Sequence, residues 1–402
     1  MKRRIEKGQA QGVINAPPSK SFAHRLLICG ALSNGNCTID GITDSVDMKA
    51  TLSCIEALGC EFTKTGDTVS IIGNKKRGNR VFNCYESGST LRFFIPIALL
   101  SGEECTFVGT QRLISRGIEI YEEIFKKQGI LCEKSETTIQ LKGKLKPDMF
   151  SLRGDVSSQF ISGLMFALPL LDGDSVINIT TNLESSAYID ITIEALKLFG
   201  IQIEKGQNSF YIKGNQKYTC ANVTVEGDYS NAAFLDGFNL LGGGVSVLGL
   251  NSDSVQGDKA YKDYFEQIER GTPTIDISMC PDLGPVLFAL AAVKNGATFV
   301  GTKRLKIKES DRAEAMKAEL EKLGARVEVF ENSVIVGSGA KAPVDTLYGH
   351  NDHRIVMALS LILTLFGGEI EGCEAVDKSY PDFFDDLAKI GIRSEILDEN
   401  NK

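Results

Sequence analysis

Cations and hydroxyls stand at the front of an apolar segment near the start of the chain. The segment PPSKSFAHRLLICGALSNG, residues 17–35, places Lys20, Ser21 and Arg25 just before a run that is typical of a buried helix. Ser21 and Arg25 are four residues apart, so they share one face of a helix. Helix N-termini carry free N–H groups and partial positive charge, and they bind anions readily. These residue types at this position therefore indicate an anion-binding site.

The same pattern recurs along the chain. It returns in GSTLRFFIPIALLSG, SSQFISGLMFALPLLDG, NAAFLDGFNLLGGG, DLGPVLFALAAVKNG and DHRIVMALSLILTLFGG. Each segment is polar at its front, apolar for two or three turns, and closed by glycine, the usual residue just past a helix C-terminus. An amphipathic helix, a glycine and a β-hairpin follow with nearly the same period, although the copy near YFEQIERGTPTIDIS is shortened. The sequence therefore contains about six copies of one βαβαββ unit.

Two kinds of helix alternate in this repeat, and one of them is apolar on all sides. Such a helix belongs in an interior. If three units share one core, the apolar helices can lie parallel inside it, with sheets and amphipathic helices around them. We therefore predict an α/β (α+β) protein of two similar three-unit domains, an inside-out α/β barrel. Residues 1–18 and 227–402 would form one domain and residues 19–226 the other, with the active site in the cleft between them.

The amino-acid composition disfavours several classes of function. The chain has 402 residues, of which 43% are hydrophobic and 24% charged, a balance typical of a soluble globular protein. No apolar run is long enough to cross a bilayer. Ten cysteines without a C-x-x-C pair and only three histidines disfavour disulfides and metal clusters, and a net charge of −8 disfavours nucleic-acid binding. We expect a cytoplasmic monomer with small-molecule substrates, no metal, no cofactor, and no nucleic-acid or membrane partner.

Each polar position also has a purely structural interpretation. Ser157 and Ser158 could be ordinary N-caps, and Asp352 could simply cap its helix. His353 is better read as a structural histidine than as a base, and Ser310 or Asp311 could cap an amphipathic helix. Each alternative holds for a single position. The coincidence of six such helix starts favours a shared anion site.

Eight motifs resemble one known family. PPSKSFAHR, GSTLRFF, SSQF, YIDIT, PDLGPV, KIKESDR, NDHRIVMALSL and KSYPDFF resemble 5-enolpyruvylshikimate-3-phosphate (EPSP) synthase, in family order from residue 17 to 387. The resemblance implies two domains of three βαβαββ units each. It also implies transfer of the enolpyruvyl group of phosphoenolpyruvate to the 5-hydroxyl of shikimate 3-phosphate, with release of phosphate and without a cofactor. In the family this step leads to chorismate and the aromatic amino acids, and glyphosate competes with phosphoenolpyruvate.

The resemblance also assigns roles to individual residues. It implies that shikimate 3-phosphate is bound by Lys20, Ser21, Arg25, Ser157, Ser158, Gln159, Ser185, Asp282 and Lys308. It implies that phosphoenolpyruvate is bound by Lys20, Gly88, Arg112, Gln159, Arg312, Arg354 and Lys378. For catalysis it points to Asp282 as the base and Glu309 as the acid, with Lys20 taking part in proton transfer. The two substrates bring roughly five or six negative charges, which suits this set of arginines and lysines.

Four positions depart from the family pattern. Pro18 replaces a common glycine before Ser19 and Lys20. Glu86 stands where the family more often has asparagine, two residues before Gly88. Phe93 occupies a position often held by proline, and Arg304 replaces a common asparagine that contacts substrate. That asparagine contact is therefore not transferred to this chain.

Two other functions remain open from the sequence. One is the sister enzyme that transfers enolpyruvyl to UDP-N-acetylglucosamine, which starts with Lys-Asn and carries a reactive cysteine on a loop. Here Lys20 is followed by serine, and the corresponding segment VGTQRLISRG has no cysteine. The other is a catalytically silent anion-binding relative, which only an assay excludes.

Overall fold

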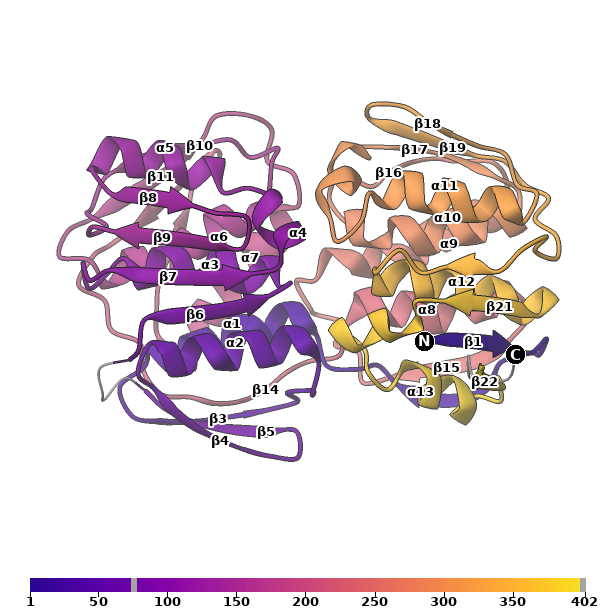
Figure 1. Cartoon of the computed structure of the whole chain (residues 1–402), viewed down its shortest axis with the longest axis horizontal. Helices are drawn as coiled ribbons and strands as arrows, with labels where there is room; N and C mark the ends of the chain where they lie inside the picture. Colours follow the sequence, from indigo (N-terminus) through magenta and orange to yellow (C-terminus); the bar gives the residue numbers. More distant parts are fainter. Residues whose placement is uncertain (74–77, 398–402) are drawn as a thin grey trace. The chain divides into compact units, whose positions relative to one another are not determined.

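The chain is folded into two compact units (Figure 1). The structure is a computed structural model that describes residues 1–73 and 78–397. The continuous unit is Lys20–Glu226, and the discontinuous unit combines Met1–Ser19 with Gly227–Lys402.

The continuous unit contains three four-stranded sheets with one strand order. Their strands are, in spatial order, β14 (Asn222–Thr224), β3 (Asn36–Asp40), β5 (Thr68–Ile72) and β4 (Glu61–Thr65); β6 (Val81–Tyr85), β7 (Cys105–Gly109), β9 (Thr138–Lys142) and β8 (Leu131–Lys134); and β10 (Met149–Leu152), β11 (Ser175–Ile179), β13 (Ser209–Ile212) and β12 (Glu204–Lys205). In every sheet the first pair is parallel and the next two pairs are antiparallel. This repetition confirms the βαβαββ unit predicted from the sequence.

The helices of this unit differ in how completely they are buried. They are α1 (Lys20–Leu32), α2 (Val46–Ala57), α3 (Gly88–Ala98), α4 (Gln111–Ser115), α5 (Glu119–Gln128), α6 (Ser158–Ala167) and α7 (Ser186–Leu198), with a 3₁₀ turn at Leu168–Leu170. In α1 every residue from Phe22 to Ala31 is buried, and α3 and α6 are buried almost throughout. By contrast, α5 buries one face only. The apolar helices therefore form the interior, as their all-round hydrophobicity predicts.

The discontinuous unit repeats this plan with one shortened copy. Its sheets are β20 (Leu347–Tyr348), β21 (Gly368–Glu371), β1 (Lys2–Ile5) and β22 (Ser394–Leu397); β16 (Thr274–Asp276), β17 (Ala297–Val300), β19 (Ser333–Val336) and β18 (Val327–Val329); and the pair β15 (Gly244–Leu248) and β2 (Gln11–Asn15). Its helices are α8 (Tyr229–Leu240), α9 (Tyr261–Arg270), α10 (Gly284–Val293), α11 (Arg312–Lys322), α12 (His353–Phe366) and α13 (Phe383–Lys389), with 3₁₀ turns at Gly257–Ala260, Pro281–Leu283, Lys303–Ile307 and Cys373–Lys378. In the shortened copy α9 leads into β16, and the described residues form no hairpin there.

Strands distant in sequence complete the sheets. Strand β1 lies between β21 and β22 of the C-terminal sheet, and β14 pairs in parallel with β3 although almost the whole continuous unit separates them in sequence. The parallel pairs β6–β7, β10–β11, β16–β17 and β20–β21 are each connected through a helix, as neighbouring parallel strands require. None of the helices in the described part of the chain is long and apolar enough to cross a membrane.

The all-apolar helices should dominate stability. Leu290 in α10 is 0% exposed, so Leu290→Ala should lower the free energy of unfolding by about 2–5 kcal/mol through lost burial and the cavity left behind. The matched control is Leu248→Ala, because Leu248 is 51% exposed and its removal should cost less than about 0.5 kcal/mol. Urea unfolding followed by circular dichroism measures both, and equal losses would contradict the buried position of α10.

Candidate functional site

Asp282 lies at the centre of a cluster of cations in the discontinuous unit. It belongs to the 3₁₀ turn that leads into α10. Its Oδ1 accepts hydrogen bonds from Lys308 Nζ at 3.0 Å and Arg312 Nη1 at 2.7 Å, and its Oδ2 accepts one from Arg354 Nη2 at 3.1 Å. Burial raises the pKa of Asp282, but the charges of Arg354, Lys308 and Arg312 outweigh burial and hold that pKa well below its usual value. Asp282 is therefore an ionised carboxylate.

Arg312 joins three carboxylates around one buried guanidinium. It begins α11, its side chain is 1% exposed, and besides Asp282 it donates through Nε to Asp352 Oδ2 at 2.8 Å and through Nη2 to Glu309 Oε2 at 2.8 Å. Burial lowers the pKa of Arg312, but Asp352, Glu309 and Asp282 more than compensate and raise it. Asp352 does cap α12, since it accepts from the backbone N–H of Arg354. Its capping role and its role in the cluster coexist.

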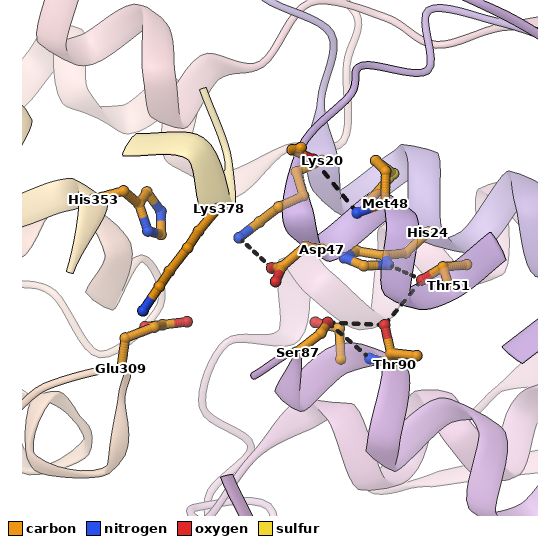
Figure 2. Close-up of polar contacts among 12 residues, drawn as sticks. Lys20, His24, Asp47, Met48, Thr51, Ser87, Thr90, Glu309, His353 and Lys378 are labelled. Carbon is orange, nitrogen blue, oxygen red and sulfur yellow. Dashed lines mark hydrogen bonds and ion pairs between the residues drawn. The ribbon is translucent and has the colours of Figure 1, made fainter. Parts of the chain in front are cut away.

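Arg354 and Lys378 are the other two predicted site cations of this unit. Arg354 lies in the first turn of α12 and donates from Nη1 to Ser230 Oγ at 2.5 Å, in the first turn of α8. Lys378 Nζ donates to the backbone oxygen of Asn351 at 2.7 Å. The Lys378 side chain extends toward Glu309 (Figure 2). Four predicted cations thus lie around two predicted catalytic carboxylates.

A strained turn supports these side chains, and sequence reasoning missed it. His350 and Asn351 have φ values of 49° and 53°, in the left-handed region that non-glycine residues rarely adopt. The Glu319 carboxylate, only 2% exposed, accepts from His350 Nε2 at 2.7 Å and from the backbone N–H of Tyr348 at 2.9 Å. Such strain costs of order 1–3 kcal/mol per residue and persists where surrounding contacts hold it. Glu319 and His350 thereby fix the turn that presents Asn351 to Lys378.

In the continuous unit, the helix that opened the sequence analysis presents two cations. Lys20 begins α1 and pairs through Nζ with Asp47 Oδ2 at 2.9 Å, as Figure 2 shows. Arg25 donates through Nε to Thr192 Oγ1 at 2.7 Å, and its guanidinium lies 4.9 Å from the centre of the Phe93 ring. Burial lowers the pKa of Arg25 to about 9. Phe93, the departure from the family pattern, thus supports Arg25 by a cation–π contact.

The start of α6 is tied to the start of α3. Gln159 accepts from Arg92 Nη1 at 2.7 Å and donates through Nε2 to Ser89 Oγ at 2.9 Å. Ser157 is the N-cap of α6 and accepts from the backbone N–H of Gln159, and Ser158 beside it is buried. The N-cap interpretation of Ser157 is therefore correct for its hydrogen bond. Arg92 belongs to the motif GSTLRFF, and the family resemblance assigns no substrate to it.

Gly88 lies against an arginine that the sequence did not single out. A Cβ atom at Gly88, the first residue of α3, would lie 3.0 Å from the guanidinium nitrogens of Arg116. Arg112 is exposed in α4, four residues before Arg116. That i, i+4 spacing is the signal that could have drawn attention to Arg116. Ser185, with φ 53°, is buried directly before α7.

The structure places the predicted site residues in two groups, one in each unit. The discontinuous unit carries Asp282, Lys308, Glu309, Arg312, Arg354 and Lys378, and the continuous unit carries Lys20, Ser21, Arg25, Gly88, Arg112, Ser157, Ser158, Gln159 and Ser185. Each lies in the first two turns of a helix or in the segment leading into one. Arg304 is buried in the 3₁₀ turn Lys303–Ile307. Within residues 1–73 and 78–397, no group of three or more His, Cys, Asp or Glu side chains is arranged to hold a metal ion.

Comparisons with known proteins agree on one family. The family model described as EPSP synthase (3-phosphoshikimate 1-carboxyvinyltransferase) matches residues 5–387. The 3-phosphoshikimate 1-carboxyvinyltransferase of Clostridium novyi is 43% identical over 98% of each chain, and that of Clostridium acetobutylicum is 44% identical over 95% of each. EPSP synthase from Acinetobacter baumannii superposes with a TM-score of 0.79 at 20% identity, covering 99% of this chain and 100% of that one. The enolpyruvyl transferase NikO from Streptomyces tendae gives 0.78 at 14% identity over 98% of each chain. The likeness to these structures confirms the predicted fold class.

Removing a partner of the buried Arg312 should destabilise the discontinuous unit. Asp352 is 0% exposed, and Asp352→Ala leaves part of a buried positive charge uncompensated, which should cost about 3–5 kcal/mol. The comparison is Asp311→Ala, which removes only the N-cap of α11 and should cost about 0.5–2 kcal/mol. Equal losses in urea unfolding would contradict the ion-pair cluster as a source of the larger effect.

Proposed function

The chain belongs to the EPSP synthase family, and on that premise we propose that it transfers the enolpyruvyl group of phosphoenolpyruvate to the 5-hydroxyl of shikimate 3-phosphate. The products are 5-enolpyruvylshikimate 3-phosphate and phosphate. The observation that carries the proposal is the ionised Asp282 carboxylate, held by Lys308, Arg312 and Arg354. A carboxylate among cations supplies both a proton acceptor and binding groups for anionic substrates. The proposal assigns substrate-binding residues to both units, so catalysis requires both.

The predicted cations match the charge of the substrates. Each substrate carries a phosphate and a carboxylate, and together they bring roughly five or six negative charges. Lys308, Arg312 and Arg354 are already compensated by Asp282 and its neighbours, so substrate binding redistributes their contacts. Arginine can bind phosphate and carboxylate groups through two parallel hydrogen bonds.

In the addition step, a proton is transferred to Asp282. The 5-hydroxyl oxygen forms a bond to C2 of phosphoenolpyruvate while the methylene carbon C3 gains a proton, which gives a tetrahedral intermediate. Asp282 accepts the hydroxyl proton, for which an ionised carboxylate is required. The low pKa of Asp282 makes it a weak base in the free protein. Substrate groups that draw Arg354 and Lys308 away from Asp282 would make it more basic.

The second step eliminates phosphate. A proton leaves the methyl group, the C2–C3 double bond forms again, and the C–O bond to phosphate breaks, while the proton held by Asp282 passes to the departing phosphate. Glu309 is assigned the proton exchange at C3, and Lys20, ion-paired with Asp47, is assigned substrate binding and a part in proton transfer. To act as a proton donor, Glu309 must give up its ion pair with Arg312 Nη2, and substrate binding would allow this by drawing Arg312 to its own anionic groups. Cations near the departing phosphate stabilise its charge.

Phosphate release tests the reaction and the base together. Wild-type protein should release phosphate from phosphoenolpyruvate with shikimate 3-phosphate, and not with UDP-N-acetylglucosamine, as acceptor. Asp282→Asn keeps the shape but removes the proton acceptor, so kcat should fall by about 10²–10⁴-fold. Release only with the UDP-sugar would replace the acceptor assignment. No release with either acceptor, from a folded protein that still binds phosphoenolpyruvate, would indicate a silent relative.

Lys308 should set the alkaline limit of activity. Burial lowers its pKa to about 8, against the opposing effect of Asp282. Below that pH Lys308 is charged and binds anions, and above it the charge is lost, so kcat/KM for shikimate 3-phosphate should fall above pH about 8. In Lys308→Met, kcat/KM should be low and without this limb, whereas Lys306→Met, which changes an exposed neighbour, should retain it. An unchanged alkaline limb in Lys308→Met would assign the titration to another group.

A further inference from the structure

A chain of four buried polar side chains crosses three helices of the continuous unit (Figure 2). His24 Nδ1 lies 2.7 Å from Thr51 Oγ1, which lies 2.9 Å from Thr90 Oγ1. Thr90 Oγ1 in turn donates to Ser87 Oγ at 2.8 Å. All four side chains are at most 1% exposed. A polar network this deep is favourable only when its members satisfy one another.

The hydrogen atoms of the chain can be assigned by counting. A hydroxyl has one hydrogen to donate, and that of Thr90 is given to Ser87 Oγ. Thr90 Oγ1 must therefore accept the hydrogen of Thr51. Thr51 then has none left for His24, so His24 Nδ1 must be the donor to Thr51 Oγ1. Hydrogen bonds are therefore donated in one direction along this series of side chains, from the imidazole of His24 to Ser87, the N-cap of α3.

This direction fixes the state of His24. Burial, with the charges of Lys20 and Arg25, lowers the pKa of His24 well below its usual value, so the ring is neutral. A neutral imidazole carries one hydrogen, which the chain places on Nδ1. Nε2 is then an acceptor, and it is buried without a hydrogen-bond partner among the described residues. An Nε2–H form would leave Thr51 without its donor.

The two ends of the hydrogen-bonded chain, His24 and Ser87, lie near residues to which phosphoenolpyruvate is assigned. His24 lies one turn after Lys20 in α1, and Thr51 lies one turn after Asp47, the ion-pair partner of Lys20, in α2. Ser87 is the N-cap of α3 and directly precedes Gly88. The chain therefore ties together the helix starts that present Lys20 and Gly88.

Arg25, on the same helix, is held by other contacts. It donates to Thr192 Oγ1 at 2.7 Å and to the backbone oxygen of Tyr188 at 2.9 Å, both in α7. These contacts do not involve His24, Thr51 or Thr90. Loss of the chain should therefore disturb the assigned phosphoenolpyruvate groups more than Arg25, to which shikimate 3-phosphate is assigned.

We propose that His24, as a neutral Nδ1–H imidazole, is a positioning residue that sets Lys20 and Gly88 for phosphoenolpyruvate through Thr51, Thr90 and Ser87. The substrate named in this proposal rests on the proposed function. His24 itself does not touch the reacting atoms in this role. The role concerns geometry, because small displacements of binding groups reduce both affinity and rate.

Paired substitutions separate the effect of the hydrogen bond between His24 and Thr51 from the effect of the imidazole ring itself. The amide nitrogen of asparagine can occupy the place of Nδ1, whereas that of glutamine reaches the place of Nε2. His24→Asn should therefore keep KM for phosphoenolpyruvate close to wild type, and His24→Gln should raise it about tenfold, the size expected for one lost buried hydrogen bond. Thr51→Val, which is isosteric, should raise it similarly, and Thr51→Ser should restore it. Lys20 is also assigned to shikimate 3-phosphate, but Gly88 is not and Arg25 has its own contacts, so KM for shikimate 3-phosphate should change less than KM for phosphoenolpyruvate in His24→Gln and Thr51→Val.

A buried threonine elsewhere supplies the control for stability. Thr364 in α12 is buried and donates to the backbone oxygen of Leu361 in its own helix, at 2.8 Å. Thr364→Val should lower the melting temperature without changing KM for phosphoenolpyruvate. If Thr51→Val lowered the melting temperature but left KM unchanged, the chain would be structural only and the positioning role would be wrong.

The tautomer can be measured without any substrate. In protein labelled with ¹⁵N-histidine, only three histidines contribute signals, and His24→Asn identifies that of His24. The expected spectrum at neutral pH shows a protonated Nδ1 and an unprotonated Nε2. A protonated Nε2, or a doubly protonated ring, would overturn the proposal even if the transfer reaction were confirmed. If the reaction failed, the spectrum would still test the chain, and calorimetric binding of phosphoenolpyruvate would replace KM.

Discussion

The arrangement of the discontinuous unit depends on one buried guanidinium. Arg312 is almost fully inaccessible and contacts Asp282, Glu309 and Asp352, which come from three separate segments. Transfer of a charge from water to an interior is costly unless partners compensate it closely. Those segments must therefore meet at one point, which brings the candidate base to Nη1 and the candidate acid to Nη2 of the same guanidinium.

Arg25 in the continuous unit shows the opposite case. Its hydrogen bonds go to the hydroxyl of Thr192 and to the backbone oxygens of Ser21 and Tyr188, none of which carries a charge. Accordingly its pKa is lowered by burial, whereas that of Arg312 is raised by carboxylates. A buried cation with neutral partners gains most from an anionic ligand, which supports its assignment to shikimate 3-phosphate. Arg312 must instead exchange an existing partner.

Neutral hydrogen bonds in the interior of the continuous unit specify how its helices are oriented relative to one another. The chain from His24 to Ser87 carries no net charge, yet its donors and acceptors can be satisfied in only one order. Apolar side chains at these positions would pack without specifying the relative rotation of three helices. Directional hydrogen bonds add that specification, as does the pairing of Glu319 with His350 at the strained turn.

The repeat, the fold class and the family could all be predicted from the sequence, because hydrophobic period, glycine placement and motif order are local properties that recur along the chain. The sequence also identified the helix starts as the place of the polar side chains. Their partners became known only from the folded chain: Asp47 for Lys20, Phe93 for Arg25, Arg116 beside Gly88, and Glu319 behind His350. The pairing of β14 with β3 was likewise beyond the local pattern. The reason is physical, since a side-chain contact between distant segments depends on the distance and rotation of two packed elements, and a sequence pattern specifies neither.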